Sequence, residues 1–378
     1  MRRSPASHAD VEERAPGQEW APGPPRRWAA GFLLAGFAAL VAYYLVADEL
    51  QDAVYHAIAL ACVVALTVRS WIAGSRDRGA WLLLGVGVLL WLVGDLVLTA
   101  LETSQGGTAP FPSYAHAIYL AGYPAIAIAA MHASRLRAHP QDRGAGLEAL
   151  MVTLAVAVPV YAFWIAPALA DSGQSTSAAV VSTAYPVMDL LLIAVGVRLA
   201  LGIRHWSVAA LLLAAGLGAN VLADVGYNVQ ILAGTYTSPA PIDAGWLISY
   251  LCWGAAALHP SAGSILEPAR EPSRPTARSR AMLLSLIVVP PLTVVGTSYT
   301  FGTELDAGAV LGALVAISIV MIVRLRDIAR TGSSPWRPTG LLYSVAFVVL
   351  VSAVGLTQIH AEGQQRVAAI QSLLRADA

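Results

Sequence analysis

Apolar runs of about twenty residues recur along most of the chain, and this feature constrains the fold more than any other. A bilayer core about 30 Å thick is crossed by roughly 20 apolar helical residues, so each run predicts a membrane-spanning helix. The runs cover residues 28–47, 53–73, 80–101, 113–132, 147–168, 178–203, 207–233, 241–259, 281–302, 307–326 and 338–358. The sequence therefore predicts an all-α, polytopic integral membrane helical bundle with about eleven transmembrane helices.

The composition agrees with a membrane protein and excludes other classes. Only 12% of the residues are charged, against about 25% in soluble domains, so a soluble globular enzyme is excluded. The net charge of zero gives no basis for a nucleic-acid partner. Cys62 and Cys252 both lie in apolar runs and indicate neither a disulfide framework nor a zinc site. We expect the lipid bilayer as a partner, and no metal, cofactor or nucleic acid.

The arginines predict the orientation of the chain in the plasma membrane. Cytoplasmic flanks of membrane helices collect basic residues. All 23 basic residues are arginines, and 21 of them lie in the N-terminal segment and in alternate connections between the runs. Residues 1–27, rich in Arg, Glu, Pro and Gly, are expected to form a disordered cytoplasmic tail. Eleven spans then place residues 359–378, a short C-terminal tail, outside the cell.

Two parts of the chain align with each other. The aligned pairs are Tyr55 with Tyr185, Asp95 with Asp224, His116 with Asp243, Tyr119 with Trp246 and Tyr123 with Tyr250. The alignment predicts two four-helix units, residues 28–132 and 147–259, followed by a cytoplasmic linker, 260–280, and three further spans within 281–358. Because four is even, both units would have the same orientation, which is a parallel tandem repeat. Chance similarity between apolar helices is the alternative.

Polar and aromatic side chains share one face of several predicted helices. Asn220, Asp224 and Tyr227 follow spacings of four and three residues, which places them on one face. The candidate ligand-binding residues on such faces are Asp95, His116, Tyr119, Tyr123, Asp189, Asn220, Asp224, Tyr227, Asp243, Trp246 and Tyr250. At a rise of about 1.5 Å per residue, Asp189 is expected near the membrane centre and the other ionisable groups towards the outer leaflet.

Aspartates at these depths need a chemical explanation. A charged aspartate at the bilayer centre costs about 2.5–3.5 kcal/mol, and the sequence predicts no arginine at comparable depth. Such residues are expected to be protonated, hydrogen-bonded to Tyr, Trp or His, or exposed to a cavity that receives a cation or small ligand. Polar contacts that only fix helix packing are the alternative, and for the aromatic residues an interfacial belt.

Catalytic motifs are missing from the sequence. It contains no His-Glu-x-x-His, no Gly-x-Ser-x-Gly and no Walker loop. The residues before Asp95 and Asp189 do not match the signatures of intramembrane aspartyl proteases. We therefore expect no enzymatic activity in this chain.

Five strings occur in a characteristic order. They are Trp91-Leu-Val-Gly-Asp95, Phe111-Pro-Ser-Tyr-Ala-His116 through Pro124, Ala184-Tyr-Pro-Val-Met-Asp189, Leu222-Ala-Asp-Val-Gly-Tyr227 and Asp243-Ala-Gly-Trp-Leu-Ile-Ser-Tyr250. Over residues 28–326 the chain resembles the N-terminal membrane region of actinobacterial GGDEF/EAL proteins. The resemblance implies an input module, which in that family precedes cytoplasmic domains that make or degrade cyclic di-GMP. No GGDEF or EAL sequence follows Arg330, and His116 stands where the family would have an aspartate.

Three functional hypotheses follow from these observations. The first is a non-enzymatic sensory, input or scaffold protein related to cyclic di-GMP signalling. It would have an outward-facing ligand or cation pocket between the repeats and a cytoplasmic or membrane signalling partner. The second is a proton- or cation-coupled secondary transporter of a small solute, and the third is a degenerate fragment without activity.

Overall fold

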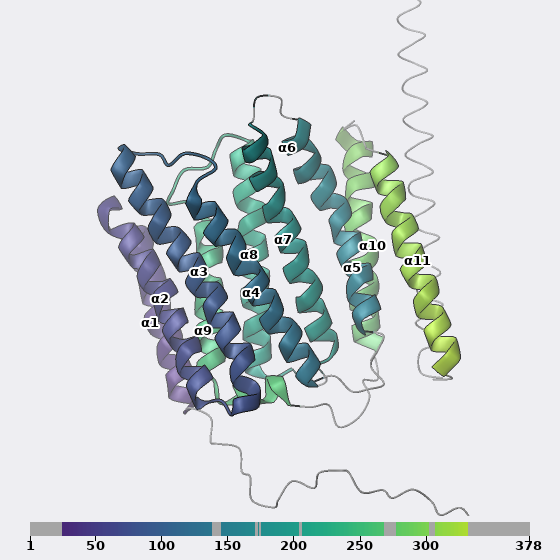
Figure 1. Ribbon diagram of the computed structural model, residues 1–378, viewed down its shortest axis with the longest axis horizontal. Coiled ribbons are helices and arrows are strands. Elements are labelled where there is room, and N and C mark those ends of the chain that lie inside the picture. Colours follow the sequence, from purple (N-terminus) through teal and green to yellow (C-terminus); the bar gives the residue numbers. More distant parts are fainter. Residues whose placement is uncertain are drawn as a thin grey trace, which may run out of the picture.

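The described part of the chain is built from helices alone (Figure 1). The computed structural model describes residues 25–137, 145–170, 173, 175–203, 206–267, 277–301 and 307–331. The α-helices are α1 (Arg26–Leu45), α2 (Asp48–Ile72), α3 (Ser75–Gln105), α4 (Tyr114–Arg137), α5 (Ala145–Val160), α6 (Ala166–Ala170), α7 (Thr176–Leu201), α8 (Val208–Leu232), α9 (Asp243–Leu258), α10 (Ala277–Phe301) and α11 (Ala307–Thr331). Two short irregular helices, η1 (Tyr161–Ile165) and η2 (Pro260–Leu266), complete them. The predicted all-α class is confirmed.

Seven helices are long and apolar enough to cross a membrane. They are α1, α2, α4, α7, most of α3 and of α8, and the continuous helix Ala145–Ala170 that α5, η1 and α6 form. Each coincides with one of the apolar runs in the sequence. The chain therefore has the character of a multi-pass helical membrane protein.

The other four expected spans, 241–259, 281–302, 307–326 and 338–358, are not among the helices of the described residues that are long and apolar enough to cross a membrane. Helix α9 has 16 residues, about 24 Å at 1.5 Å per residue, which is less than the bilayer core needs. Helices α10 and α11 contain shorter apolar segments, Ser285–Val294 and Val315–Arg324. The expected span 338–358, the tail 359–378 and residues 1–24 of the expected N-terminal tail lie outside the described residues. The number of eleven spans stays a prediction.

Local side-chain chemistry sets several helix ends. The hydroxyl oxygen of Ser175 accepts a hydrogen bond from the Ala178 N–H, and that of Ser207 from the Ala210 N–H, so each satisfies a donor that the first helical turn leaves free. Helix α3 ends at Gly106, whose φ of 76° is a left-handed conformation that glycine adopts without strain. Pro159 is followed by the π-helical turn η1, an irregularity that hydropathy does not predict.

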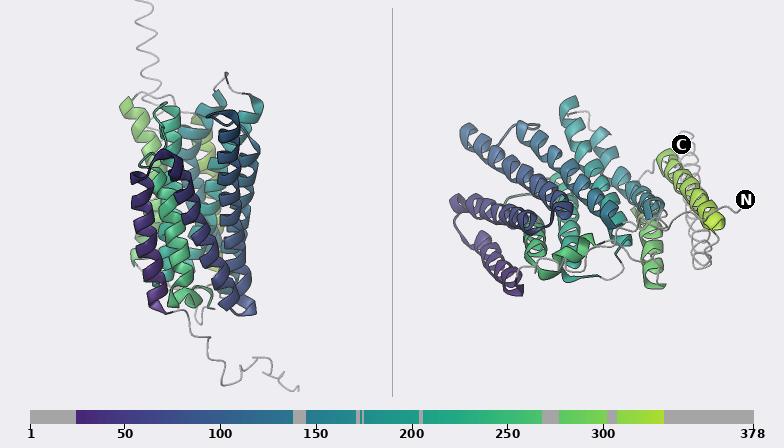
Figure 2. Two further views of the ribbon diagram at one scale, coloured as in Figure 1. Left: turned by 90° about the vertical axis from the view of Figure 1, so that its left-hand side faces the viewer. Right: turned by 60° about the horizontal axis from the view of Figure 1, so that its bottom comes forward.

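Helix α9 is the centre of the packing. It contacts α1, α2 and α8, while α3 packs against both α2 and α4, and α4 against α7 (Figure 2). The buried side chains of these helices form the larger hydrophobic core. At one side of the bundle, α10 and α11 pack against α5 and form a smaller core around Met151, Ile287 and Ile317 (Figure 1).

Glycines allow two helix pairs to approach closely. A Cβ atom on Gly87 of α3 would lie 3.0 Å from the carbonyl oxygen of Gly122 in α4, and one on Gly216 of α8 would lie 3.1 Å from that of Ser249 in α9. In a membrane, helices associate through tight packing and polar contacts, because lipid tails are as apolar as the side chains. The α3–α4 and α8–α9 pairs therefore depend on these small residues.

A buried ion pair joins α5 to α11. The Arg324 guanidinium donates to Glu148 Oε1 from Nη2 at 3.0 Å and from Nε at 3.2 Å. Both side chains are about 95% buried, with 6% and 5% of their surface exposed. The sequence indicates only that Arg324 belongs to a basic flank of the run 307–326, and it does not predict this contact.

Candidate functional site

The predicted acidic and aromatic residues form two hydrogen-bonded groups, one between α3 and α4 and one between α4, α8 and α9, with Asp189 of α7 beside the second; we call them together the carboxyl network. At one side of the network, the Tyr119 hydroxyl donates to Asp95 Oδ1 at 2.7 Å. The Trp91 indole N–H donates to the Tyr119 carbonyl oxygen at 3.1 Å, which fixes α3 against α4. The second carboxyl oxygen of Asp95 is buried and has no partner among the described residues.

Asp224 of α8 is the most heavily hydrogen-bonded carboxyl group of the network. Its Oδ1 accepts from the Trp246 indole N–H at 2.8 Å, and its Oδ2 accepts from the Asn220 amide at 2.9 Å. A longer contact of 3.5 Å brings the Tyr123 hydroxyl from α4. Asp224 therefore ties α8 to both α9 and α4.

Asp189 of α7 lies against Asp224. It is 3% exposed, and neither of its carboxyl oxygens accepts from an N–H or O–H group of the described residues. The Asp224 carboxyl group of the neighbouring helix lies close to it. A bond between two carboxyl groups needs a proton on one of them, because two carboxylates have no donor. A hydrogen bond between Asp189 and Asp224 would therefore require a shared proton.

Tyrosine and tryptophan rings enclose the carboxyl groups. The Tyr185 ring of α7 lies edge-on to Tyr123 with centroids 6.3 Å apart, and the Tyr55 ring of α2 lies edge-on to Tyr250 at 6.2 Å. Tyr123 and Tyr250 are each only 4% exposed. Such offset aromatic contacts add about 0.5–1.5 kcal/mol beyond the burial of area, so the rings give the network a rigid wall.

Asp243 belongs to a separate cluster at the start of α9. Its Oδ2 accepts from the Ala240 N–H at 2.8 Å and from the Tyr43 hydroxyl at 3.2 Å, and its Oδ1 accepts from Tyr236 at 3.1 Å. Burial, and next the neighbouring Asp243 carboxyl group, raise the pKa of Tyr236 above its ordinary value, so that this hydroxyl stays protonated and donates. The cluster connects α1 and the α8–α9 loop to α9.

Two predicted residues lie at the edges of these groups. The Tyr227 ring contacts Trp246 at 5.6 Å and Tyr236 at 4.8 Å between centroids, so it lies between the network and the Asp243 cluster. His116 accepts at Nδ1 from the backbone N–H of Ser113 at 3.1 Å. Its imidazole therefore holds the start of α4 and makes no hydrogen bond to the carboxyl groups.

The structure thus separates the predicted site residues into a central network and its surroundings. The network contains Asp95, Tyr119, Tyr123, Asp189, Asn220, Asp224 and Trp246, with Tyr250 in its aromatic wall. Asp243, Tyr227 and His116 lie around it. The candidate set omits Tyr55 and Tyr185, although their alignment in the repeat is a usable signal. Tyr236 gives no such signal because it lies in a loop.

Replacing Asp243 with alanine is expected to destabilise the protein by about 2–4 kcal/mol. The change leaves the Ala240 N–H and the Tyr43 and Tyr236 hydroxyls without their acceptor, and each unsatisfied buried donor costs about 1–3 kcal/mol. SDS titration of the protein in mixed micelles measures the loss. Asp243→Asn keeps one acceptor oxygen and should lose clearly less, so equal losses in the two variants would contradict this role.

Comparisons with family models, curated proteins and solved structures find no match to this chain. The chemistry of the site must therefore be argued from its own residues. No group of three or more His, Cys, Asp or Glu side chains that could hold a metal ion occurs in the part of the chain that the structure describes. What the network does offer is a pair of buried carboxyl groups, Asp189 and Asp224, close together on adjacent helices.

Proposed function

We propose that this chain is a membrane-embedded sensory or input module in which proton occupancy of the Asp189–Asp224 pair sets the state of the bundle. The observation that carries the proposal is the proximity of two buried carboxyl groups on adjacent helices, one of which accepts no hydrogen bond from an N–H or O–H group of the described residues. No arginine within the described helices donates to either group. Two unpaired negative charges would repel strongly at such a site, and a shared proton removes that cost.

A change of proton occupancy has a structural consequence in this arrangement. With a proton, the pair forms a hydrogen bond that joins α7 to α8. Without it, the two carboxylates repel each other and favour separation of the helices. Pro186, one turn before Asp189, interrupts the hydrogen-bond ladder of α7 and gives the helix a point at which to bend. The signal is then a movement of α7 relative to α8.

The proposal includes the parallel repeat of residues 28–132 and 147–259, because contacts recur at aligned positions. Tyr119 donates to Asp95 and its aligned counterpart Trp246 donates to Asp224. The close approach of Gly87 to Gly122 corresponds to that of Gly216 to Ser249. The ring pairs are exchanged between units, Tyr55 with Tyr250 and Tyr185 with Tyr123. The carboxyl network therefore lies where the two units meet.

The cellular setting follows from the sequence. The resemblance to the input region of GGDEF/EAL proteins supports a role in cyclic di-GMP signalling, with a separate cytoplasmic or membrane partner receiving the signal. The arginine distribution supports a plasma-membrane location with the N-terminus in the cytoplasm and eleven spans. A C-terminal reporter active only outside the cell would agree with eleven spans, and a reporter active in the cytoplasm would exclude them.

The test is the pH dependence of stability. Because the native state holds a proton that the unfolded state releases, stability should fall as pH rises, by up to about 1.4 kcal/mol per pH unit for one linked proton. SDS titrations of the purified protein between about pH 5 and 8 measure this slope. In Asp189→Asn the amide donates to Asp224 without needing a proton, so the slope should become smaller.

Glu267→Gln is the matched control for this test. Glu267 is exposed directly after η2 and belongs to neither the carboxyl network nor the Asp243 cluster. The control should keep the slope of the wild type. A wild type and an Asp189→Asn variant with equal slopes would remove the basis of the proposal.

A proton-coupled secondary transporter is the second candidate. The position of Asp189 within the span Thr176–Leu201, next to a helix-interrupting proline, favours it, because carrier carboxyl groups must change partner during transport. Proteoliposomes with an inward proton gradient test it by uptake of a solute panel. Uptake that Asp189→Asn abolishes would support transport, and absence of flux in the wild type across the panel would reject it.

A further inference from the structure

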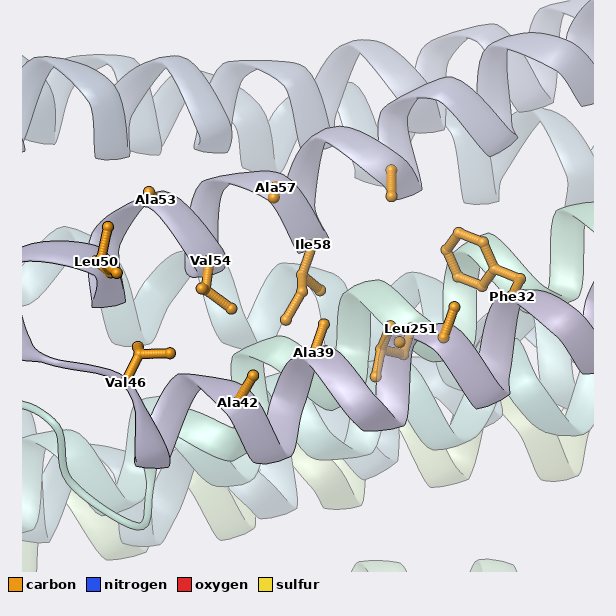
Figure 3. Close-up of a pocket in the computed structure, with 13 residues that line it drawn as sticks. Phe32, Ala39, Ala42, Val46, Leu50, Ala53, Val54, Ala57, Ile58 and Leu251 are labelled. Atoms are coloured by element: carbon orange, nitrogen blue, oxygen red, sulfur yellow. The ribbon is translucent and has the colours of Figure 1, made fainter.

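A long apolar groove runs between α1 and α2, away from the carboxyl network. Its volume is about 500 Å³, and it extends along α1 from Phe32 to Val46 (Figure 3). Alanines line much of both sides: Ala35, Ala39 and Ala42 on α1, and Ala53, Ala57 and Ala61 on α2. Figure 3 shows Val54 and Ile58 pointing from α2 towards α1. No lining side chain is charged or polar.

The groove exists because α1 is attached to α9 more tightly than to α2. Gly36 of α1 faces Leu251 of α9 with no room for a Cβ atom, and Gly254 of α9 faces the ring of Phe32 in the same way. At the other end of α1, the Tyr43 hydroxyl donates to Asp243 and the Tyr44 hydroxyl donates to the Ala240 carbonyl oxygen. Leu251 lies at the base of the groove between α1 and α2 (Figure 3), and the alanine side chains are too short to fill the remaining space.

Hydrocarbon is the medium that fits this space. Both walls belong to helices with the length and composition of membrane spans, so the open side of the groove faces lipid chains. Ala35, Ala53, Ala57 and Ala61 are exposed, which shows that the groove is open rather than enclosed. Water is disfavoured there, because a site needs two to four polar partners to hold a water molecule. The fourteen residues of α1 from position 32 to its end at Leu45 span about 21 Å, more than the roughly 15 Å depth of one leaflet of a 30 Å core.

Two acidic residues at the Val46–Leu50 end of the groove favour one class of lipid headgroup over others. Asp48 and Glu49 are exposed in the first turn of α2, beside the groove residues Val46 and Leu50. Among residues 40–55 there is no arginine. An anionic headgroup or a free fatty-acid carboxylate would meet two like charges, whereas a protonated amine would pair with them.

We propose that this groove binds one acyl chain of a phospholipid whose headgroup carries a protonated amine, with the amine at Asp48 and Glu49. The lipid fills the gap that α9 creates by holding α1 away from α2. Because the same contacts with α9 include the Tyr43–Asp243 bond, an acyl chain in the groove supports the position of α1 on the Asp243 cluster. The site is independent of the proton proposal.

The experiment uses the full chain in nanodiscs with a phosphatidylethanolamine that carries a diazirine on one acyl chain. Light attaches the lipid to the protein, and peptide mass spectrometry locates the label. We expect the label at the groove residues of α1 and α2, and we expect Ala39→Phe with Ala57→Phe to reduce it about tenfold. Ala38→Phe, an exposed position on α1 outside the groove, should leave the labelling unchanged. Label spread over α1 in proportion to exposure would overturn the proposal.

Competition identifies the headgroup. Unlabelled phosphatidylethanolamine should displace the probe from wild type, and phosphatidylglycerol and palmitate should not. Asp48→Asn with Glu49→Gln leaves the groove walls intact and should let phosphatidylglycerol compete equally. Equal competition by all three lipids in the wild type would overturn the assignment of an amine headgroup, whatever the effect of the phenylalanine variants on folding.

Discussion

Replacing Arg324 with methionine is expected to destabilise the protein by about 3–5 kcal/mol. The change leaves the Glu148 carboxylate buried without the guanidinium that donates to it at 3.0 and 3.2 Å, and removal of one member of a buried ion pair has this cost. Glu148→Met should have a similar effect, because it removes the carboxylate that accepts both hydrogen bonds from the buried guanidinium. SDS titration in mixed micelles measures the free energy of unfolding of each variant.

The double variant separates the charge from the packing. With Glu148→Met and Arg324→Met together, neither charge of the pair remains, and apolar groups of similar size occupy the space between α5 and α11. The double variant should recover most of the stability lost in either single variant. Losses that simply add would show that the ion pair does not join the two helices.

Replacing Gly216 with leucine is expected to destabilise the protein by about 3 kcal/mol or more. A Cβ atom at this position would overlap the indole of Trp253 and lie 3.1 Å from the Ser249 carbonyl oxygen. The indole has little freedom to move, because it is 2% exposed and its N–H donates to the Leu213 carbonyl oxygen at 3.2 Å. It also stacks on Trp91 with centroids 5.9 Å apart. Helices α8 and α9 must therefore separate.

Gly218 provides the matched control on the same helix. A Cβ atom there meets nothing within 4 Å, so Gly218→Leu tests the change of residue type without the clash. Leucine favours helix by about 0.8–1 kcal/mol over glycine, and Gly218→Leu should leave stability unchanged or raised. Thermal denaturation in detergent compares the two variants, and equal melting temperatures would contradict the close packing of α8 on α9.

The helices were predictable because their signal is local. A run of about twenty apolar residues is sufficient to mark a span, and α1, α2, α4 and α7 follow such runs closely. The π-helical turn after Pro159 was not predictable, because a proline in a helix can be accommodated in several ways. Arg324 shows a different limit: its sequence position indicates a basic flank, whereas its pairing with Glu148 depends on how α11 lies on α5.

The sequence predicts which residues belong to the candidate site, but it predicts only partly which of them lie together in space. Helical spacing and the repeat identified Asp95 and Asp224, but spacing within one helix cannot show that Asp189 of α7 lies against Asp224 of α8. Asp243 aligns with His116, yet neither belongs to the network. Each accepts a hydrogen bond from a backbone N–H of the loop that precedes its own helix. The groove between α1 and α2 was not predictable, because alanine-rich faces usually indicate close helix contact and the intervening Leu251 comes from a helix distant in sequence.

The central position of α9 also determines when the bundle can be completed during biosynthesis. Tyr43 of α1 and Asp243 of α9 are 200 residues apart in the chain, which corresponds to roughly 10–40 s of translation at about 5–20 residues per second. During that interval α1 and α2 are in the membrane without the helix that packs between them and α8. Helix α1, whose most extensive contacts are with α9, thus lacks its main packing partner until that later helix arrives, whereas α2 can already pack on α3.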